Sequence, residues 1–202
     1  MVEGETVLNA GNDVDVIAAD NNSATQFNDI NNLSVGTVTA EAVSADRAMT
    51  AMNGAIDAAE MSETGITSSD DDVKLTAAGN LTFEEAVSLG AGDLFLDVNG
   101  DVTQIATGTI NAAGLGLMVD GVTILDEAND VTVLAINNQS DTDFNDINDI
   151  LIGTVVIEEV VSDRAMSGSI ATDIMSITGI TTSNDDVGLQ AVSYTHLTLP
   201  TI

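Results

Sequence analysis

Alternating apolar and polar positions recur along residues 72–135 in short runs that each end at Gly, Asn or Asp. The runs that begin at Val73, Leu94 and Leu115 open rounds about 21 residues apart, and second runs lie between them at 81–83, 102–105 and 122–125. Alternation with a period of two predicts strands, and strands this short cannot bury an apolar side alone. Stacking each round on the previous one solves that problem, because every strand then lies beside its successor.

The pattern therefore predicts an all-β fold, a parallel β-solenoid with roughly 20–25 residues per round. Hydrophobic residues make up 44% of the chain but aromatic residues only 2%, so we expect a core of Val, Ile, Leu and Ala. Small aliphatic side chains in alternation suit thin, regular layers. About nine rounds, spaced by about 4.8 Å, would form a rod of roughly 43 Å.

A long internal repeat supports the same fold. Residues 6–75 match residues 123–189 at an offset of 117, and about 22 of 38 positions are identical without a gap between 12–49 and 129–166. After a slip of three residues, 64–75 match 178–189. A duplication of this size adds whole rounds to a one-dimensional fold without disturbing their neighbours, whereas a globular enzyme rarely tolerates it. We therefore expect residues 1–190 to be one solenoid segment without catalytic activity.

One stretch inside each copy is irregular. Residues 41–61 place Met49, Met52 and Ile56 at helical spacing, but residues 167–169 interrupt that stripe in the second copy. Equivalent positions should share one structure, so we favour strand and loop. A short helix in the first copy remains the alternative.

The two ends of the sequence differ in character. Residues 1–13 lack the basic and apolar regions of a signal peptide. Residues 6–18 already look like the middle of a repeat, so we expect a fragment of a longer protein. Residues 191–202 hold the only Tyr, His and Pro of the chain. The run SYTHLTLPTI resembles translated sequencing-adapter read-through in metagenomic sequences, so we expect a non-native tail and assign His196 no function.

Charge and composition exclude several classes of partner and site. Three basic residues against 33 acidic ones give a net charge of -30, so nucleic acid and anionic membrane surfaces are not expected partners. No apolar run approaches 18 residues, and no cysteine is present for disulfides or thiolate chemistry. Stacked carboxylates repel one another, which favours a saline or calcium-containing extracellular setting. Simple solubility of an acidic surface explains the charge equally well.

The candidate chemistry is sparse. Asp97, Asn99 and Asp101 have the alternate oxygen spacing of a calcium loop, and calcium is the only cofactor that the sequence suggests. Val102 stands where such a loop needs Gly, and Gly108 where it needs Glu, so a turn at Asn99-Gly100 is the preferred interpretation.

Two other polar features are duplicated. Residues 70–72 and 184–186 are equivalent acidic turns that could share a weak cation, although a structural turn is again favoured. Arg47 and Arg164 occupy the same place in two copies of the run DRAM, which indicates a local ion pair rather than catalysis. Neither a nucleophilic triad nor a phosphate-binding glycine loop can be built, so no catalytic or cofactor-binding residue is predicted.

The runs TGITSSDDDVKLTAAGNLTF, GDVTQIATGTINAAG and TILDEANDVTVLA resemble the degenerate repeats of filamentous-haemagglutinin-type adhesins and autotransporter passenger domains. The resemblance covers most of residues 6–190. It implies a right-handed parallel β-helix, secretion across a Gram-negative envelope, and an extracellular or cell-surface location. It also implies a role as the stalk or binding face of a large surface protein, whose other parts would contact host or surface glycans or proteins. The alternatives are a carbohydrate-active β-helix enzyme and a calcium-dependent surface-layer module.

Overall fold

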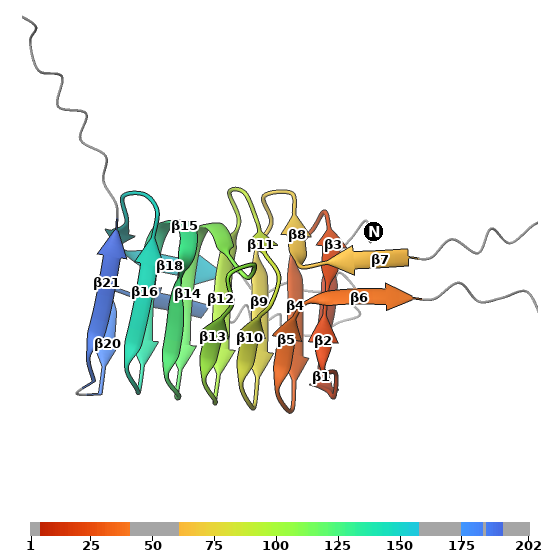
Figure 1. The fold of residues 1–202 in the computed structure, drawn as a ribbon, viewed down its shortest axis with the longest axis horizontal. Coiled ribbons are helices and arrows are strands. Elements are labelled where there is room, and N and C mark those ends of the chain that lie inside the picture. Colours follow the sequence, from red (N-terminus) through yellow and green to blue (C-terminus); the bar gives the residue numbers. More distant parts are fainter. Residues whose placement is uncertain (1–4, 41–60, 158–174, 184, 192–202) are drawn as a thin grey trace, which may run out of the picture.

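The structure is a computed structural model that describes residues 5–40, 61–157, 175–183 and 185–191. Strands and turns account for these residues, and no helix occurs among them. Seventeen strands form one large sheet in which the paired strands are parallel, and two short antiparallel pairs lie outside it. The parallel stack in Figure 1 confirms the predicted all-β, solenoid-like architecture.

The strands follow the chain in successive rounds. Those of the stack are β1 (Thr6–Asn12), β2 (Val16–Ile17), β3 (Ala19–Asn21), β4 (Thr25–Asp29), β5 (Leu33–Val35), β8 (Ile66–Ser68), β9 (Val73–Ala77), β10 (Leu81–Phe83), β11 (Val87–Ser88), β12 (Asp93–Val98), β13 (Val102–Gln104), β14 (Ile110–Val119), β15 (Thr123–Asn138), β16 (Thr142–Asp146), β17 (Leu151–Ile152), β20 (Ile180–Thr182) and β21 (Val187–Ala191). The antiparallel pairs are β6 (Thr37–Ala40) with β7 (Met61–Thr64), called hairpin 1, and β18 (Thr154–Ile157) with β19 (Met175–Thr178), called hairpin 2.

Stacked strands form three columns. The first holds β1, β4, β9, β12, the end of β14, the end of β15, and then β17 and β20, which both pair with the end of β15. The second holds β2, β5, β10, β13, the start of β15, β16 and β21. The third holds β3, β8, β11, the start of β14 and the middle of β15.

The register confirms the predicted period. Leu94 pairs with Val73 and with Leu115, two steps of 21 residues, and Leu115 pairs with Leu134 after 19. The second column holds seven of the described strands rather than the nine rounds expected. The number is smaller because residues 37–64 and 154–178 contain hairpins that leave the stack.

The core lies inside the columns and consists of aliphatic layers that also hold Phe27, Phe83 and Phe144, so the expected core of Val, Ile, Leu and Ala omitted its largest side chains. Leu75, Leu96, Leu117 and Ile136 pair in register, are fully buried and belong to one apolar cluster. Alternate side chains of β9, β10 and β13 are buried and partly exposed, as a period of two requires.

One strand begins at a different residue from the one that the sequence pattern predicts. The strand predicted from Val122 begins at Thr123, which pairs with Val102. Val122 and Ile124 are 37% and 40% exposed, whereas Thr123 is buried and its Oγ1 accepts a hydrogen bond from Asn138 Nδ2 at 3.1 Å. Thr123 therefore points inward because it has a polar partner there, and not because its side chain is apolar.

The two copies of the long repeat lie on different columns. Strands β1, β4 and β9 belong to the first column, but their counterparts, residues 123–129 of β15, then β16 and β21, belong to the second. Residues that are 117 positions apart in the sequence are therefore separated by several rounds along the stack and by one column around it.

Candidate functional site

The same hairpin is built at equivalent places in the two copies. Hairpin 1 leaves the stack where the Gly65 N–H donates to the Gly36 carbonyl at 2.9 Å, and hairpin 2 where the Gly179 N–H donates to the Gly153 carbonyl at 2.7 Å. Hydroxyl pairs support the first rung of each, Thr37 with Thr64 at 3.1 Å and Thr154 with Thr178 at 2.9 Å.

Hairpin 2 covers an outward-facing apolar area on the first column. Val155 and Ile177 are buried against Phe95 and Ala135, and Met118 and Val133 pack at the margin. Gly114 and Gly116 allow this close approach, since a Cβ atom on Gly114 would lie 3.1 Å from Val155 Cγ2. We call this area the covered patch; it consists of Phe95, Gly114, Gly116, Met118, Val133 and Ala135.

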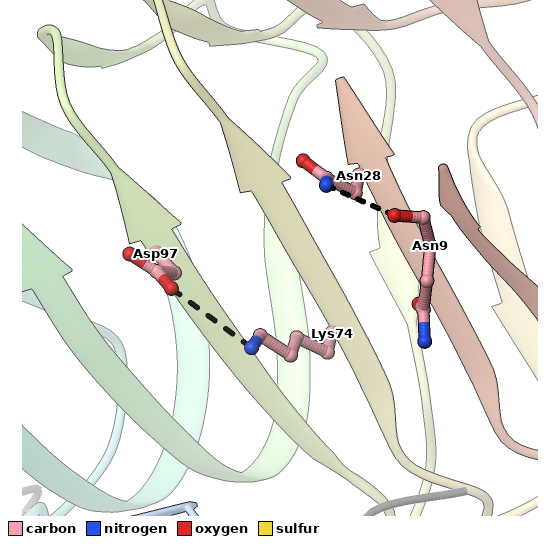
Figure 2. A network of polar contacts seen from close by, with 4 residues as sticks. All are labelled: Asn9, Asn28, Lys74 and Asp97. Carbon is pink, nitrogen blue, oxygen red and sulfur yellow. Dashed lines mark hydrogen bonds and ion pairs between the residues drawn. The ribbon is translucent and has the colours of Figure 1, made fainter. Parts of the chain in front are cut away.

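A charged pair lies at one edge of the covered patch. Lys74 Nζ lies 3.9 Å from Asp97 Oδ2 and 5.9 Å from the centroid of the Phe95 ring. Figure 2 shows Lys74 extending from β9 toward Asp97 on β12, with Asn28 and Asn9 on the neighbouring strands beyond it. A cation at this distance from an aromatic face is attracted to the ring quadrupole, so Lys74 closes the exposed end of the patch.

Burial shifts the acid–base equilibria of two carboxyl groups beside the patch. Desolvation raises the pKa of Asp97 above 3.8, Lys74 opposes the shift, and the charge of Asp120 adds to it. Desolvation and the neighbouring Asp72 raise the pKa of Asp93, while a hydrogen bond from the Gly114 N–H lowers it. In both groups desolvation is the largest effect, so the fold favours their neutral forms.

The calcium candidates lie on one strand and the turn after it. Asp97 belongs to β12, and Asn99 and Asp101 follow it. Asp101 Oδ1 accepts the Val122 N–H at 2.9 Å, and the Asp101 N–H donates to Asn80 Oδ1 at 2.9 Å. Within the described ranges, no group of three or more His, Cys, Asp or Glu side chains could hold a metal ion. The calcium site remains a prediction.

The acidic turns are also tied between rounds. Asp70 Oδ1 accepts the Ala91 N–H at 2.9 Å, Asp72 Oδ1 the Asp93 N–H at 2.9 Å, and Asp141 Oδ1 the Asp186 N–H at 3.1 Å. Asp70 has a φ of 67°, a conformation that Asp adopts more readily than most residues. These bonds supply a structural role for the Asp70 and Asp72 side chains, whereas Asp186 takes part through its backbone N–H.

Buried polar side chains at the corners are structurally important residues that the sequence analysis missed. Asn129 Nδ2 donates to the carbonyls of Leu125 and Asn145 at 3.0 Å each, and its Oδ1 accepts from the Ile110 N–H at 2.9 Å and from Gln104 Nε2 at 2.6 Å. These contacts join three successive rounds. The signal was present, because Asn12 and Asn129 begin the 38-residue stretch in which about 22 positions are identical between the copies.

A buried carboxylate works in the same way. Asp146 accepts the N–H groups of Val131 and Asn148 at 2.8 Å each, and both bonds lower its pKa. Desolvation outweighs them, so the pKa of Asp146 is raised above 3.8. Asp29 repeats the arrangement with the N–H groups of Val14 and Asn31 at 2.9 and 2.8 Å.

Several predicted features lie outside the described residues: Arg47, Arg164, His196, Asn184, and nearly all of the irregular stretch 41–61 with its helical alternative. Strand β21 ends at Ala191, so the stack includes the first residue of the expected tail.

In the part of the chain that the structure describes, no helix has the length and apolar character needed to cross a bilayer. No protein-family model, no curated protein and no solved structure matches this chain.

Proposed function

We propose that this chain is a non-catalytic structural segment of a large secreted or surface-exposed bacterial adhesin-like protein, and that it forms part of a stalk. The observation that carries the proposal is the use of its buried polar side chains. Asn129, Asp146 and Gln104 each make hydrogen bonds to a neighbouring round, so these buried groups contribute to cohesion along the stack.

This cohesion suits a load-bearing rod. Each round is joined to the next by backbone ladders in the columns and by side-chain bonds at the corners, so the force on any one interface between rounds is shared among many hydrogen bonds. We further propose that the stack is a right-handed parallel β-helix, because parallel strands joined by crossover connections are right-handed in about 98% of cases.

The proposed setting is extracellular, and binding to host or surface glycans or proteins is assigned to other parts of the full protein. A net charge of -30 supports this setting, because it makes nucleic acid an unfavourable partner and is tolerated best in a saline medium.

Pulling the chain from its two ends in a single-molecule force experiment tests the mechanical role. A stack of rounds should lengthen in successive steps of about 20 residues, or roughly 70 Å each. One all-or-none extension of the whole chain would contradict the stalk proposal.

An activity assay tests the non-catalytic part. The purified chain should release neither reducing nor unsaturated sugars from marine and plant polysaccharides. Sugar release that persists through purification would favour the carbohydrate-active alternative.

A further inference from the structure

The two hairpins differ in what they cover, and hairpin 1 has a surface that the described stack leaves uncovered. Hairpin 2 runs from β15 back over β14 and β12, and therefore lies on rounds that precede it. Figure 1 shows that hairpin 1, the antiparallel pair of β6 and β7, also lies along the stack but extends past the end formed by β1, β2 and β3. Hairpin 1 contacts β2 and β3 and then overhangs that end.

The apolar residue of hairpin 1 is exposed where its counterpart is covered. Val38 is 42% exposed, whereas Val155 at the same place in hairpin 2 is 1% exposed. The bases of the two hairpins are alike, since a Cβ on Gly36 would lie 2.9 Å from Val16 Cγ1 and a Cβ on Gly153 would lie 2.8 Å from Val133 Cγ1. The difference in exposure between Val38 and Val155 therefore comes from the surface that each hairpin faces beyond its base.

A buried polar atom at the same end gives an independent indication. Asn138 Nδ2 donates to Thr123 Oγ1 and Thr142 Oγ1, and its Oδ1 accepts the Val119 N–H of the preceding round at 3.0 Å. Asn21 is its counterpart, and its Nδ2 donates to Thr6 Oγ1 at 2.9 Å and Thr25 Oγ1 at 2.8 Å. Asn21 Oδ1, however, is buried without a hydrogen-bond partner. An acceptor in that state is costly. Val119, which supplies the donor in the second copy, has Val2 as its sequence counterpart, so a preceding round that continued the stack would bring the Val2 N–H to Asn21 Oδ1.

The second copy shows what lies against the hairpin at this end. Residues 118–122 read MVDGV and are preceded by the rounds of residues 94–117, which carry Phe95, Gly114 and Gly116 of the covered patch. Residues 1–5 read MVEGE, so Met1 is the sequence counterpart of Met118. We propose that the end formed by β1, β2, β3 and hairpin 1 docks on at least two further rounds resembling residues 94–117, joined ahead of Met1 in the same polypeptide. The inference rests on the duplicated stack and not on the proposed stalk role.

A graft tests the proposal on the full chain. Residues 76–117, which are two rounds of 21 residues in the observed register, are fused ahead of Met1. The fusion recreates the junction between Leu117 and Met118 and adds a second covered patch. We expect a higher melting temperature, added strand signal in circular dichroism, and roughly tenfold slower amide exchange in β1, β2 and β3.

Matched substitutions identify the contact. Val155→Ala should lower the melting temperature of both the parent and the grafted chain. Val38→Ala should leave the melting temperature of the parent chain unchanged. In the grafted chain it should lower the melting temperature by about as much as Val155→Ala does. Hairpin 1 has Glu63 where hairpin 2 has Ile177, so Glu63→Ile should raise the melting temperature of the grafted chain only.

The proposal is overturned if the graft leaves exchange in β1, β2 and β3 unchanged, or if Val38→Ala has no effect in either chain. A graft of one round, residues 97–117, serves as a second variant. Failure of both grafts to add folded strand would also overturn the proposal. Concentration-dependent end-to-end assembly of the parent that Val38→Asp abolishes would instead assign this surface to a second copy. The force and sugar-release experiments are independent of these outcomes.

Discussion

Asparagine suits the corners of this stack because its amide can donate and accept at once. Asn129 uses both functions to join the rounds on either side of it, whereas Asn12 keeps the donor contacts with the Leu8, Ala10 and Asn28 carbonyls. The pair therefore separates the value of the acceptor contacts from that of the donor contacts.

Asn129→Ala should lower the free energy of unfolding by about 3 kcal/mol, because it leaves buried groups of several neighbours without partners. Asn12→Ala, at a partly exposed position, should cost about 1 kcal/mol. Urea unfolding of the two variants measures the difference. Equal losses would contradict the inter-round role of Asn129.

The glycines that close the hairpins offer a second matched pair. Gly65 and Gly179 have φ values of 68° and 69°, but a Cβ on Gly65 would lie 2.2 Å from the Ala86 carbonyl oxygen while one on Gly179 would meet nothing within 4 Å. Gly179→Ala should cost about 1–2 kcal/mol from backbone strain. Gly65→Ala should cost about 1–3 kcal/mol more from overpacking. Thermal unfolding of both variants measures this, and similar losses would show that the clash relaxes freely.

The calcium prediction can be decided at the same scale. We expect the melting temperatures with calcium and with chelator to coincide, because Asp101 Oδ1 already accepts the Val122 N–H and Asp97 lies beside Lys74. Differential scanning calorimetry is the measurement. A calcium-dependent increase that Asp101→Asn removes would establish a specific site by mass action, since Asn retains an oxygen for the Val122 N–H.

At the scale of elements, the stacked strands were predictable and the hairpins were not. The starts at Val73, Leu94 and Leu115 follow directly from the alternating pattern and pair as expected. The runs TVTA and MSET of hairpin 1 have the same alternation as stack strands. Only their antiparallel pairing over a long sequence separation distinguishes them, and that pairing leaves no local pattern. Gly36 and Gly65 were the available signal.

Phe95 ties hairpin 2 to the stack. Phe95→Ala should lower the free energy of unfolding by about 3 kcal/mol and should open hairpin 2 before the rounds themselves separate. Hydrogen exchange in β18 and β19 should then become faster than in β9 and β10. Val156→Ala is the control, because Val156 is exposed on the same hairpin. Uniformly faster exchange throughout the stack would show that the hairpin has no independent stability.

The whole molecule carries a charge of -30 together with carboxyl groups whose neutral forms the fold favours. A group with a raised folded pKa binds its proton more readily in the folded chain than in the unfolded one. Its contribution to stability is complete below its ordinary value and is lost as pH rises through the folded pKa.

We therefore expect the free energy of unfolding to rise as the pH is lowered from neutral toward 3.8, the ordinary value of Asp93, Asp97 and Asp146. Lower net charge acts in the same direction. Urea unfolding across this range measures the effect, and Asp97→Asn should make the rise shallower. A steady fall in stability on acidification would contradict it.

The column change between the copies is the feature of the whole molecule least accessible from sequence. The offset of 117 residues between the copies and the spacing of 21 residues between rounds are both visible in the sequence. The column change becomes visible only when the residues of the hairpin are subtracted from the offset of 117. That subtraction requires the strand pairings of β6 with β7 and of β18 with β19.

This column change has a geometric consequence for any longer array of the repeat. Hairpin 1 follows β5 of the second column, whereas hairpin 2 follows β17, which pairs with the end of β15 above the first column. Successive hairpins would therefore leave the rod at different angles around its axis. A ligand or neighbouring fibre that recognised them could then bind on more than one side of the rod.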